Sequence, residues 1–184
     1  MASLTPVFLA GINNSEPEHW QSSFRQRLPA GLWVEHGDWD APIAAQWVAE
    51  LDQALAPISG PVVFVAHSLG CLLVTEWVLK HPEARAAGAF CVAPPDPASP
   101  AFPHHVVQGF RPATAVDLPF PAMLVASQDD PYGSFEYASR VARAWRAPLI
   151  DAGAKGHLNA ASGLGDWPEG WGFFHAFLKQ IGQA

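Results

Sequence analysis

Ser68 is the residue whose surroundings most plainly indicate chemistry. It follows an apolar run of strand length at 61–66 and precedes a helix-like run that begins at Leu69. A serine on the sharp turn between a strand and a helix has its hydroxyl lifted above the sheet edge, and the small residues Ala66 and Gly70 let the backbone close around that turn. The pattern is a G-x-S-x-G nucleophile elbow with alanine in the first position. The alternative is that Ser68 only caps the following helix.

A nucleophilic serine needs a base that takes its proton, and the base needs a partner that orients it. Behind an elbow of this kind, the acid and then the histidine follow the nucleophile along the chain, each in a loop after a strand. Asp129 and Asp130 follow one apolar run, and His157 follows the next. Asp130 is favoured as the acid because it precedes Pro131, and an Asp-Pro pair starts a turn just past the strand, while Asp129 stays open as the alternative. The catalytic candidates are therefore Ser68, Asp130 and His157.

Other titratable residues fit these roles less well. Asp151 ends a strand, and Asp166 lies beside Trp167. His67 adjoins the nucleophile but is expected to point elsewhere on the turn. The remaining histidines lie before the elbow, outside the expected loop or in the last helix: His19, His36, His81, His104, His105 and His175. Since no set of His, Cys and carboxylate residues has zinc-ligand spacing, we expect neither a metal nor a cofactor.

Acyl transfer at a serine also requires hydrogen-bond donors for the oxyanion of the tetrahedral intermediate. The backbone N–H of Leu69, the residue after the nucleophile, is the first candidate. The second is expected from the loop after the first strand, where Gly11 permits a tight turn. Ile12 and Asn13 are both candidates for this second backbone donor.

The elements that must position these residues alternate between strand-like and helix-like runs. Strands are expected at 6–10, 32–36, 62–66, 88–92, 122–127 and 148–151, and helices at 18–27, 43–55, 69–80, 135–145 and 173–181. The strands are continuously apolar, which indicates that both faces of the sheet are covered. Alternation of this kind predicts a parallel sheet between two layers of helices, a three-layer α/β/α sandwich.

The stretch from Pro94 to Pro121 interrupts this alternation with eight prolines. Each proline removes a backbone donor and restricts the preceding residue, so a long helix is excluded. We expect an ordered excursion after the fourth strand, close to the strand ends where ligands bind in this architecture.

Length and composition limit the remaining possibilities. The 184 residues favour one domain spanning 1–184. The net charge of −7 and the absence of a basic stripe argue against nucleic acid as a partner. No apolar run approaches the roughly 20 residues of a membrane span, and the first residues do not resemble a secretory signal, so we expect a cytoplasmic protein without a membrane partner. Cys71 and Cys91 are expected to be buried free thiols.

Several short segments carry a resemblance to a known family. They are His19-Trp20, D-W-D-A-P at 38–42, A-H-S-L-G at 66–70, V-A-P-P-D at 92–96, S-Q-D-D-P-Y at 127–132, G-H-L-N at 156–159 and G-L-G-D-W-P-E-G at 163–170. With them the chain resembles the small serine hydrolases of the retinoblastoma-binding protein 9 group, a compact branch of the α/β-hydrolase superfamily. The resemblance implies the triad Ser68, Asp130 and His157, six parallel strands in the order 2-1-3-4-5-6, and no large lid. The departure at Ala66 adds a methyl group but removes no catalytic group.

These inferences together predict a serine hydrolase that cleaves small carboxylic esters or related acyl compounds through an acyl-enzyme. The expected partner is a small-molecule acyl substrate. One alternative is an interaction protein that uses the fold to bind a protein partner, which has little support in the sequence. The other is an acyltransferase that uses the same three residues.

Overall fold

One parallel sheet of six strands organises the computed structural model, which describes residues 4–15, 17–83 and 85–182. The strands are β1 (Thr5–Leu9), β2 (Leu32–Trp33), β3 (Val62–His67), β4 (Gly88–Val92), β5 (Ala122–Ala126) and β6 (Leu149–Asp151). They lie in the order β2-β1-β3-β4-β5-β6, and every neighbouring pair is parallel. The predicted fold class and strand order are confirmed.

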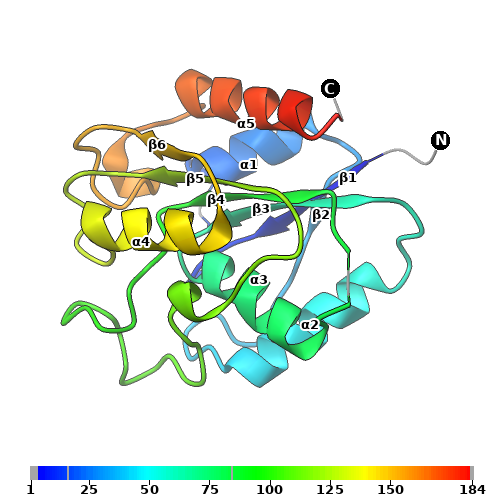
Figure 1. The fold of residues 1–184 in the computed structure, drawn as a ribbon, viewed down its shortest axis with the longest axis horizontal. Coiled ribbons are helices and arrows are strands. Elements are labelled where there is room, and N and C mark those ends of the chain that lie inside the picture. Colours follow the sequence, from blue (N-terminus) through cyan, green and yellow to red (C-terminus); the bar gives the residue numbers. More distant parts are fainter. Residues whose placement is uncertain (1–3, 16, 84, 183–184) are drawn as a thin grey trace.

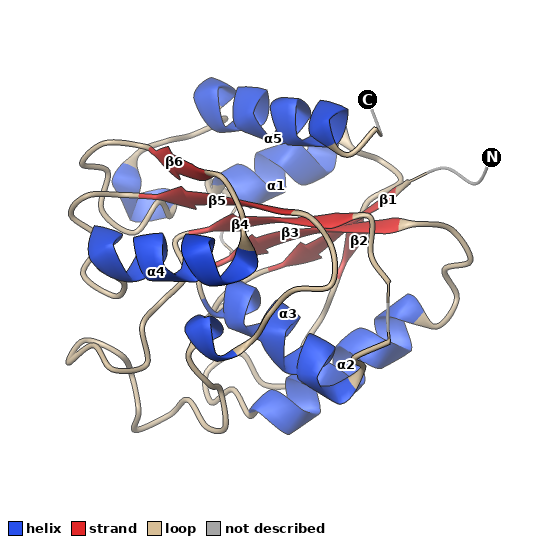
Figure 2. Cartoon of the chain, in the orientation of Figure 1, coloured by secondary structure: helices blue, strands red, loops and turns tan. Residues whose placement is uncertain are grey.

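Helices cover both faces of the sheet (Figures 1 and 2). Within the described residues they are α1 (Trp20–Arg27), α2 (Ala44–Leu55), α3 (Leu69–Lys80), α4 (Phe135–Trp145) and α5 (Pro168–Gln180). α1 and α5 lie over one face, and α2, α3 and α4 lie over the other. None of these helices is long and apolar enough to cross a membrane.

Two hydrophobic cores result, one on each side of the sheet. Alternate residues of each strand supply them: in β3, Phe64 belongs to the core under α2, α3 and α4, whereas Val63 and Val65 belong to the core under α1 and α5. All six residues of β3 are buried. This two-sided burial explains the continuous apolar runs, because a strand covered on both faces has no solvent side for polar residues.

Two predicted elements differ from the observed ones by three residues or more at one end, and the other bounds agree to within two residues. β2 ends at Trp33, and the Val34 N–H makes one more hydrogen bond to β1, at 3.1 Å from the Phe8 carbonyl oxygen. Beyond it the His36 ring stacks on Trp47 at 3.9 Å. α5 begins at Pro168, earlier than predicted. Proline is well tolerated in the first turn of a helix, where its missing N–H would have no partner. Gly170 lets the helix pass close to Trp167, since a Cβ there would lie 2.2 Å from the indole ring.

The proline-rich excursion runs from the end of β4 to β5, as expected. Between Pro94 and Pro121 its only helical segment is a single 3₁₀ turn at Ala113–Ala115. Its start is tied to the loop after β5, because the Asp96 N–H donates to the Tyr132 carbonyl at 2.9 Å. The excursion is thereby held at the carboxyl edge of the sheet, next to the predicted site.

Candidate active site

Ser68 occupies a strained turn between β3 and α3. Its φ and ψ of 53° and −123° lie in a region that favours glycine. Gly70 makes the turn possible, because a Cβ at this position would lie 2.2 Å from the Leu9 carbonyl oxygen. Gly11 is similarly close, and its Cβ would lie 2.9 Å from the Ser68 Cβ. The strand–turn–helix geometry expected around Ser68 is present, and the Ser68 side chain makes no helix-capping hydrogen bond.

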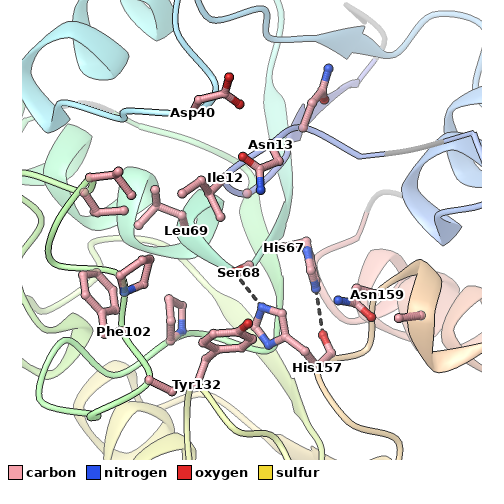
Figure 3. Close-up of a pocket in the computed structure, with 18 of the residues that line it drawn as sticks. Ile12, Asn13, Asp40, His67, Ser68, Leu69, Phe102, Tyr132, His157 and Asn159 are labelled. Atoms are coloured by element: carbon pink, nitrogen blue, oxygen red, sulfur yellow. Dashed lines mark hydrogen bonds between the residues drawn. The ribbon is translucent and has the colours of Figure 1, made fainter.

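The structure brings Ser68, His157 and Asp130 together in one hydrogen-bonded chain. Figure 3 shows the bond between Ser68 and His157. The Ser68 Oγ lies 2.7 Å from His157 Nε2. Both carboxylate oxygens of Asp130 lie 2.9 Å from His157 Nδ1. Because a carboxylate only accepts, Nδ1 carries the hydrogen and Nε2 presents its lone pair to the serine hydroxyl. This arrangement can accept the proton of Ser68.

The neighbouring Asp129 has a different function in the loop. Its Oδ1 accepts hydrogen bonds from the Ser127 hydroxyl at 2.8 Å and from the Gly156 N–H at 2.7 Å. These bonds lower the pKa of the Asp129 carboxyl, with the Ser127 bond as the larger cause. Asp129 therefore ties the loop after β5 to the loop that carries His157, without contacting the imidazole.

The weaker acid candidates make other contacts. Asp151 accepts from the Gln128 side chain at 2.7 Å, and this bond together with the Gly153 N–H lowers the pKa of its carboxyl. Asp166 pairs with Ser23 and Arg27 of α1. Asp130 is the aspartate that contacts His157.

The backbone around Ser68 distinguishes the two candidates for the second oxyanion donor. The Asn13 N–H donates to the Trp39 carbonyl at 2.9 Å, so it is already occupied. The N–H groups of Ile12 and Leu69 have no hydrogen-bond partner within the described parts of the chain. Figure 3 shows both residues beside Ser68. Ile12, rather than Asn13, is thus available together with Leu69.

A cavity of about 590 Å³ opens at Ser68 and His157. One part of its wall is apolar and includes Phe102 and Val106 of the excursion together with Leu69. Another part is polar and includes Asn13, Asn159 and Asp40. Among the described residues, no lysine or arginine lines the cavity. Within the described residues no group of three or more His, Cys, Asp or Glu side chains is arranged to hold a metal ion.

Three histidines that the sequence analysis set aside also line this cavity: His105 in the excursion, and His19 and His67 beside His157. The His19 and His67 rings meet edge to face at 4.6 Å, and the His67 ring lies 5.0 Å from that of His157. His19 Nδ1 also caps α1 by accepting from the Gln21 N–H. The signals available in the sequence were the adjacency of His67 to Ser68 and the place of His19 in a family segment.

His19 and His67 are both held in the neutral form. Burial, followed by the neighbouring His157, lowers the pKa of His19 to about 4. Burial also lowers the pKa of His67 well below its ordinary value, with smaller contributions from His19 and His157. Two neutral imidazoles therefore adjoin the serine–histidine pair.

Because of these histidines, we expect the free energy of unfolding to decrease as the pH is lowered. A histidine whose pKa is depressed by folding contributes stability above its unfolded pKa of about 6.5, and this contribution is lost as the pH falls towards the folded value. Each such group adds up to about 1.4 kcal/mol per pH unit to the slope of unfolding free energy. His19→Asn, which retains a capping side chain, should lower that slope by about this amount between pH 6 and 4 in urea denaturation series. Equal slopes in the variant and the wild type would contradict the assignment.

Known proteins are similar to this chain over most of its length. The family model for serine hydrolases matches residues 6–176. A protein described as a YdeN-like hydrolase, from Pectobacterium atrosepticum, is 31% identical, with a TM-score of 0.84 over 97% of this chain and 92% of its own. The ydeN gene product of B. subtilis is 20% identical, with a TM-score of 0.80 over 97% of this chain and 100% of its own.

A more distant structure shares the fold. A thermophilic esterase from Thermogutta terrifontis is 13% identical, with a TM-score of 0.71 over 98% of this chain and 91% of its own. A search of curated proteins gave no significant match.

Proposed function

This chain belongs to the serine hydrolase family, and we propose that it hydrolyses small carboxylic esters or related acyl compounds through an acyl-enzyme on Ser68. The observation that carries the proposal is the hydrogen-bonded chain from Asp130 through His157 to Ser68, at the wall of an open cavity. The esterase among the structural neighbours is consistent with ester chemistry on this fold.

The reaction uses His157 first as a base and then as an acid. Ser68 Oγ attacks the acyl carbonyl carbon while its proton passes to His157 Nε2. The oxygen of the leaving alcohol takes that proton as its bond to the acyl carbon breaks, and the acyl group stays on Ser68. Water then attacks the acyl carbon while one of its protons passes to His157. His157 returns this proton to Ser68 Oγ as the bond between Oγ and the acyl carbon breaks, and the carboxylic acid leaves. Asp130 keeps the His157 imidazole in the tautomer that these reaction steps require.

The free backbone donors suit the charge that develops on the carbonyl oxygen. Leu69 and Ile12 lie beside Ser68 (Figure 3), and their N–H groups have no competing acceptor in the described residues. Each donor of this kind stabilises the tetrahedral intermediate by about 2.7–4 kcal/mol. We assign the oxyanion hole to these two amides.

We propose further that the chain is related to the retinoblastoma-binding protein 9 group, on the basis of the short sequence segments that carry this resemblance. The site lies in a sheet of six strands, and the segment after β4 contributes part of its wall without forming a helical lid. A cavity of about 590 Å³ suits substrates of modest size.

A fluorophosphonate probe tests the proposed nucleophile. We expect one covalent label on the intact protein, located on Ser68 by peptide mass spectrometry, and turnover of p-nitrophenyl esters in a series of increasing acyl length. Denatured protein is the control, because the label requires the assembled site. Folded protein that neither takes the label nor hydrolyses any ester of the series would contradict the proposal.

The charges around the cavity predict a preference for neutral acyl groups. Asp40 is an exposed carboxylate on the wall, and the part of the cavity wall that the structure describes has no lysine or arginine to offset its charge. We expect p-nitrophenyl butyrate to have a higher kcat/KM than the p-nitrophenyl monoester of succinate, which adds a carboxylate. Asp40→Asn should narrow this difference by about two- to fivefold, the size of an exposed charge interaction.

Asp117→Asn is the matched control, because Asp117 is exposed and does not line the cavity. It changes the net charge by the same amount and should leave the ratio of the two esters unaltered. A change of equal size in both variants would assign the effect to overall charge instead of to Asp40.

A further inference from the structure

The loop that carries His157 is held by two buried ring N–H groups. Trp20 Nε1 donates to the Leu158 carbonyl at 2.9 Å. His67 Nε2 lies 2.9 Å from the His157 carbonyl oxygen, and it must be the donor because a carbonyl only accepts. Figure 3 shows this second bond beside the one between Ser68 and His157. Two consecutive carbonyls are thus bound from two different elements, α1 and β3.

The two donors have little freedom to move. Trp20 is 1% exposed and packs edge to face against Phe24 and Trp167, with ring centroids 4.9 and 5.3 Å away. His67 is 4% exposed and packs between the rings of His19 and His157. The Trp20 and His67 rings also meet, at 6.1 Å. The donors therefore belong to one aromatic cluster anchored in the core under α1.

The backbone that they hold would not keep its shape unaided. Leu158 has a φ of 51°, in the left-handed region that non-glycine residues rarely adopt. Gly153 and Gly156, just before His157, also have positive φ. Asp129 ties this first half of the loop through the Gly156 N–H. The hydrogen bonds from Trp20 and His67 hold the following backbone, at the carbonyls of His157 and Leu158. The His157 backbone is therefore held by hydrogen bonds on both sides.

His67 also connects the reacting pair directly. It is covalently adjacent to Ser68, and its side chain binds the backbone of His157. Any movement of the His157 backbone relative to the elbow must therefore stretch this hydrogen bond.

We propose that Trp20 and His67 are positioning residues for His157, whose ring N–H groups fix the backbone at 157 and 158 so that the imidazole faces Ser68. The proposal rests on the hydrolase function proposed above. It assigns the two residues an effect on kcat and on the rate of acylation, with little effect on KM, because neither bond involves the substrate. A misplacement of about 1 Å at a reacting group lowers rates by about 100-fold.

Trp20→Phe removes the indole N–H and retains an aromatic ring. We expect kcat and the rate of fluorophosphonate labelling to fall about 10- to 100-fold, with KM changed less than twofold. Trp167→Phe is the matched control. Trp167 lies in the same cluster and is 2% exposed, but its Nε1 has no hydrogen-bond partner in the described part of the chain. It should lower the melting temperature comparably while kcat stays within about twofold of wild type.

His67 provides a second, independent pair of variants. His67→Gln retains an N–H donor at a similar reach, and His67→Leu has none. If the bond positions the base, the glutamine variant should keep at least about tenfold more activity than the leucine variant. This comparison remains decisive if Trp20→Phe does not fold.

The outcomes separate the two proposals. An active, labelled wild type with unchanged kcat in Trp20→Phe, or with equal activities in the two His67 variants, overturns the positioning role alone. A loss of kcat as large in Trp167→Phe as in Trp20→Phe also overturns it. A wild type that neither hydrolyses esters nor takes the label overturns the hydrolase function, and the positioning role falls with it.

Discussion

Asp130→Asn is expected to lower kcat by about 10⁴-fold while leaving the fold intact. The Tyr132 N–H donates to Asp130 Oδ1 at 2.9 Å, so the amide oxygen of the variant is drawn to this donor. The amide NH₂ then faces His157 Nδ1, where it can only donate. This inverts the imidazole tautomer, and Nε2 presents a hydrogen to Ser68 instead of a lone pair. Ester turnover under saturating substrate measures the loss, and circular dichroism checks the fold.

Asp129→Asn is the matched control for this experiment. Its amide oxygen can still accept from the Ser127 hydroxyl and the Gly156 N–H, so the loop ties persist. We expect kcat within a fewfold of wild type. Equal losses in the two variants would refute the distinction between the two adjacent aspartates, and a large loss in Asp129→Asn alone would reverse their assignment.

Ser68→Ala is expected to lower kcat by roughly 10⁶-fold, because no group replaces the nucleophile. Ser68→Gly should be equally inactive, but it should be more stable than the alanine variant by about 1–3 kcal/mol. The reason is the positive φ of 53° at this position, which strains any residue that has a Cβ. Urea denaturation of the two inactive variants isolates this strain, since both lack the hydroxyl and its bond to His157.

Two results for the Ser68→Ala and Ser68→Gly variants would contradict these predictions. Equal stabilities would show that the turn holds Ser68 without strain. Residual turnover in either variant that exceeds the predicted level, and that persists after repurification, would show that another group carries the chemistry.

The proximity of Ser68, Asp130 and His157 could be predicted because parallel topology fixes it. Each residue follows the carboxyl end of a strand, and these ends meet at one edge of the sheet. The strands themselves were recognisable because burial on both faces requires continuous apolar runs, as in β3. The regular elements and their succession along the chain therefore follow from residue pattern, whereas the strand order 2-1-3-4-5-6 was implied by the family resemblance.

The contacts that depend on backbone atoms could not be predicted in this way. Trp20 and the Leu158 carbonyl are 138 positions apart in the sequence, and His67 and the His157 carbonyl are 90 apart. A carbonyl acceptor has no residue type of its own, so nothing in the sequence pairs it with a distant ring. Likewise, the choice between Ile12 and Asn13 depends on the Trp39 carbonyl, which the chain folds against Asn13.

In the proposed hydrolase, the excursion between β4 and β5 would separate selection of the acyl group from the reaction itself. Phe102 and Val106, on the apolar wall, belong to this segment, whereas the reacting side chains follow β3, β5 and β6. Near its start the segment is tied to the Asp130 loop, and the wall residues lie beyond that tie. Substitutions or length changes there can alter which acyl chains fit without shifting the hydrogen-bonded chain at Ser68. For the proposed hydrolase, exchange of this loop between relatives is therefore a direct route to a changed substrate preference.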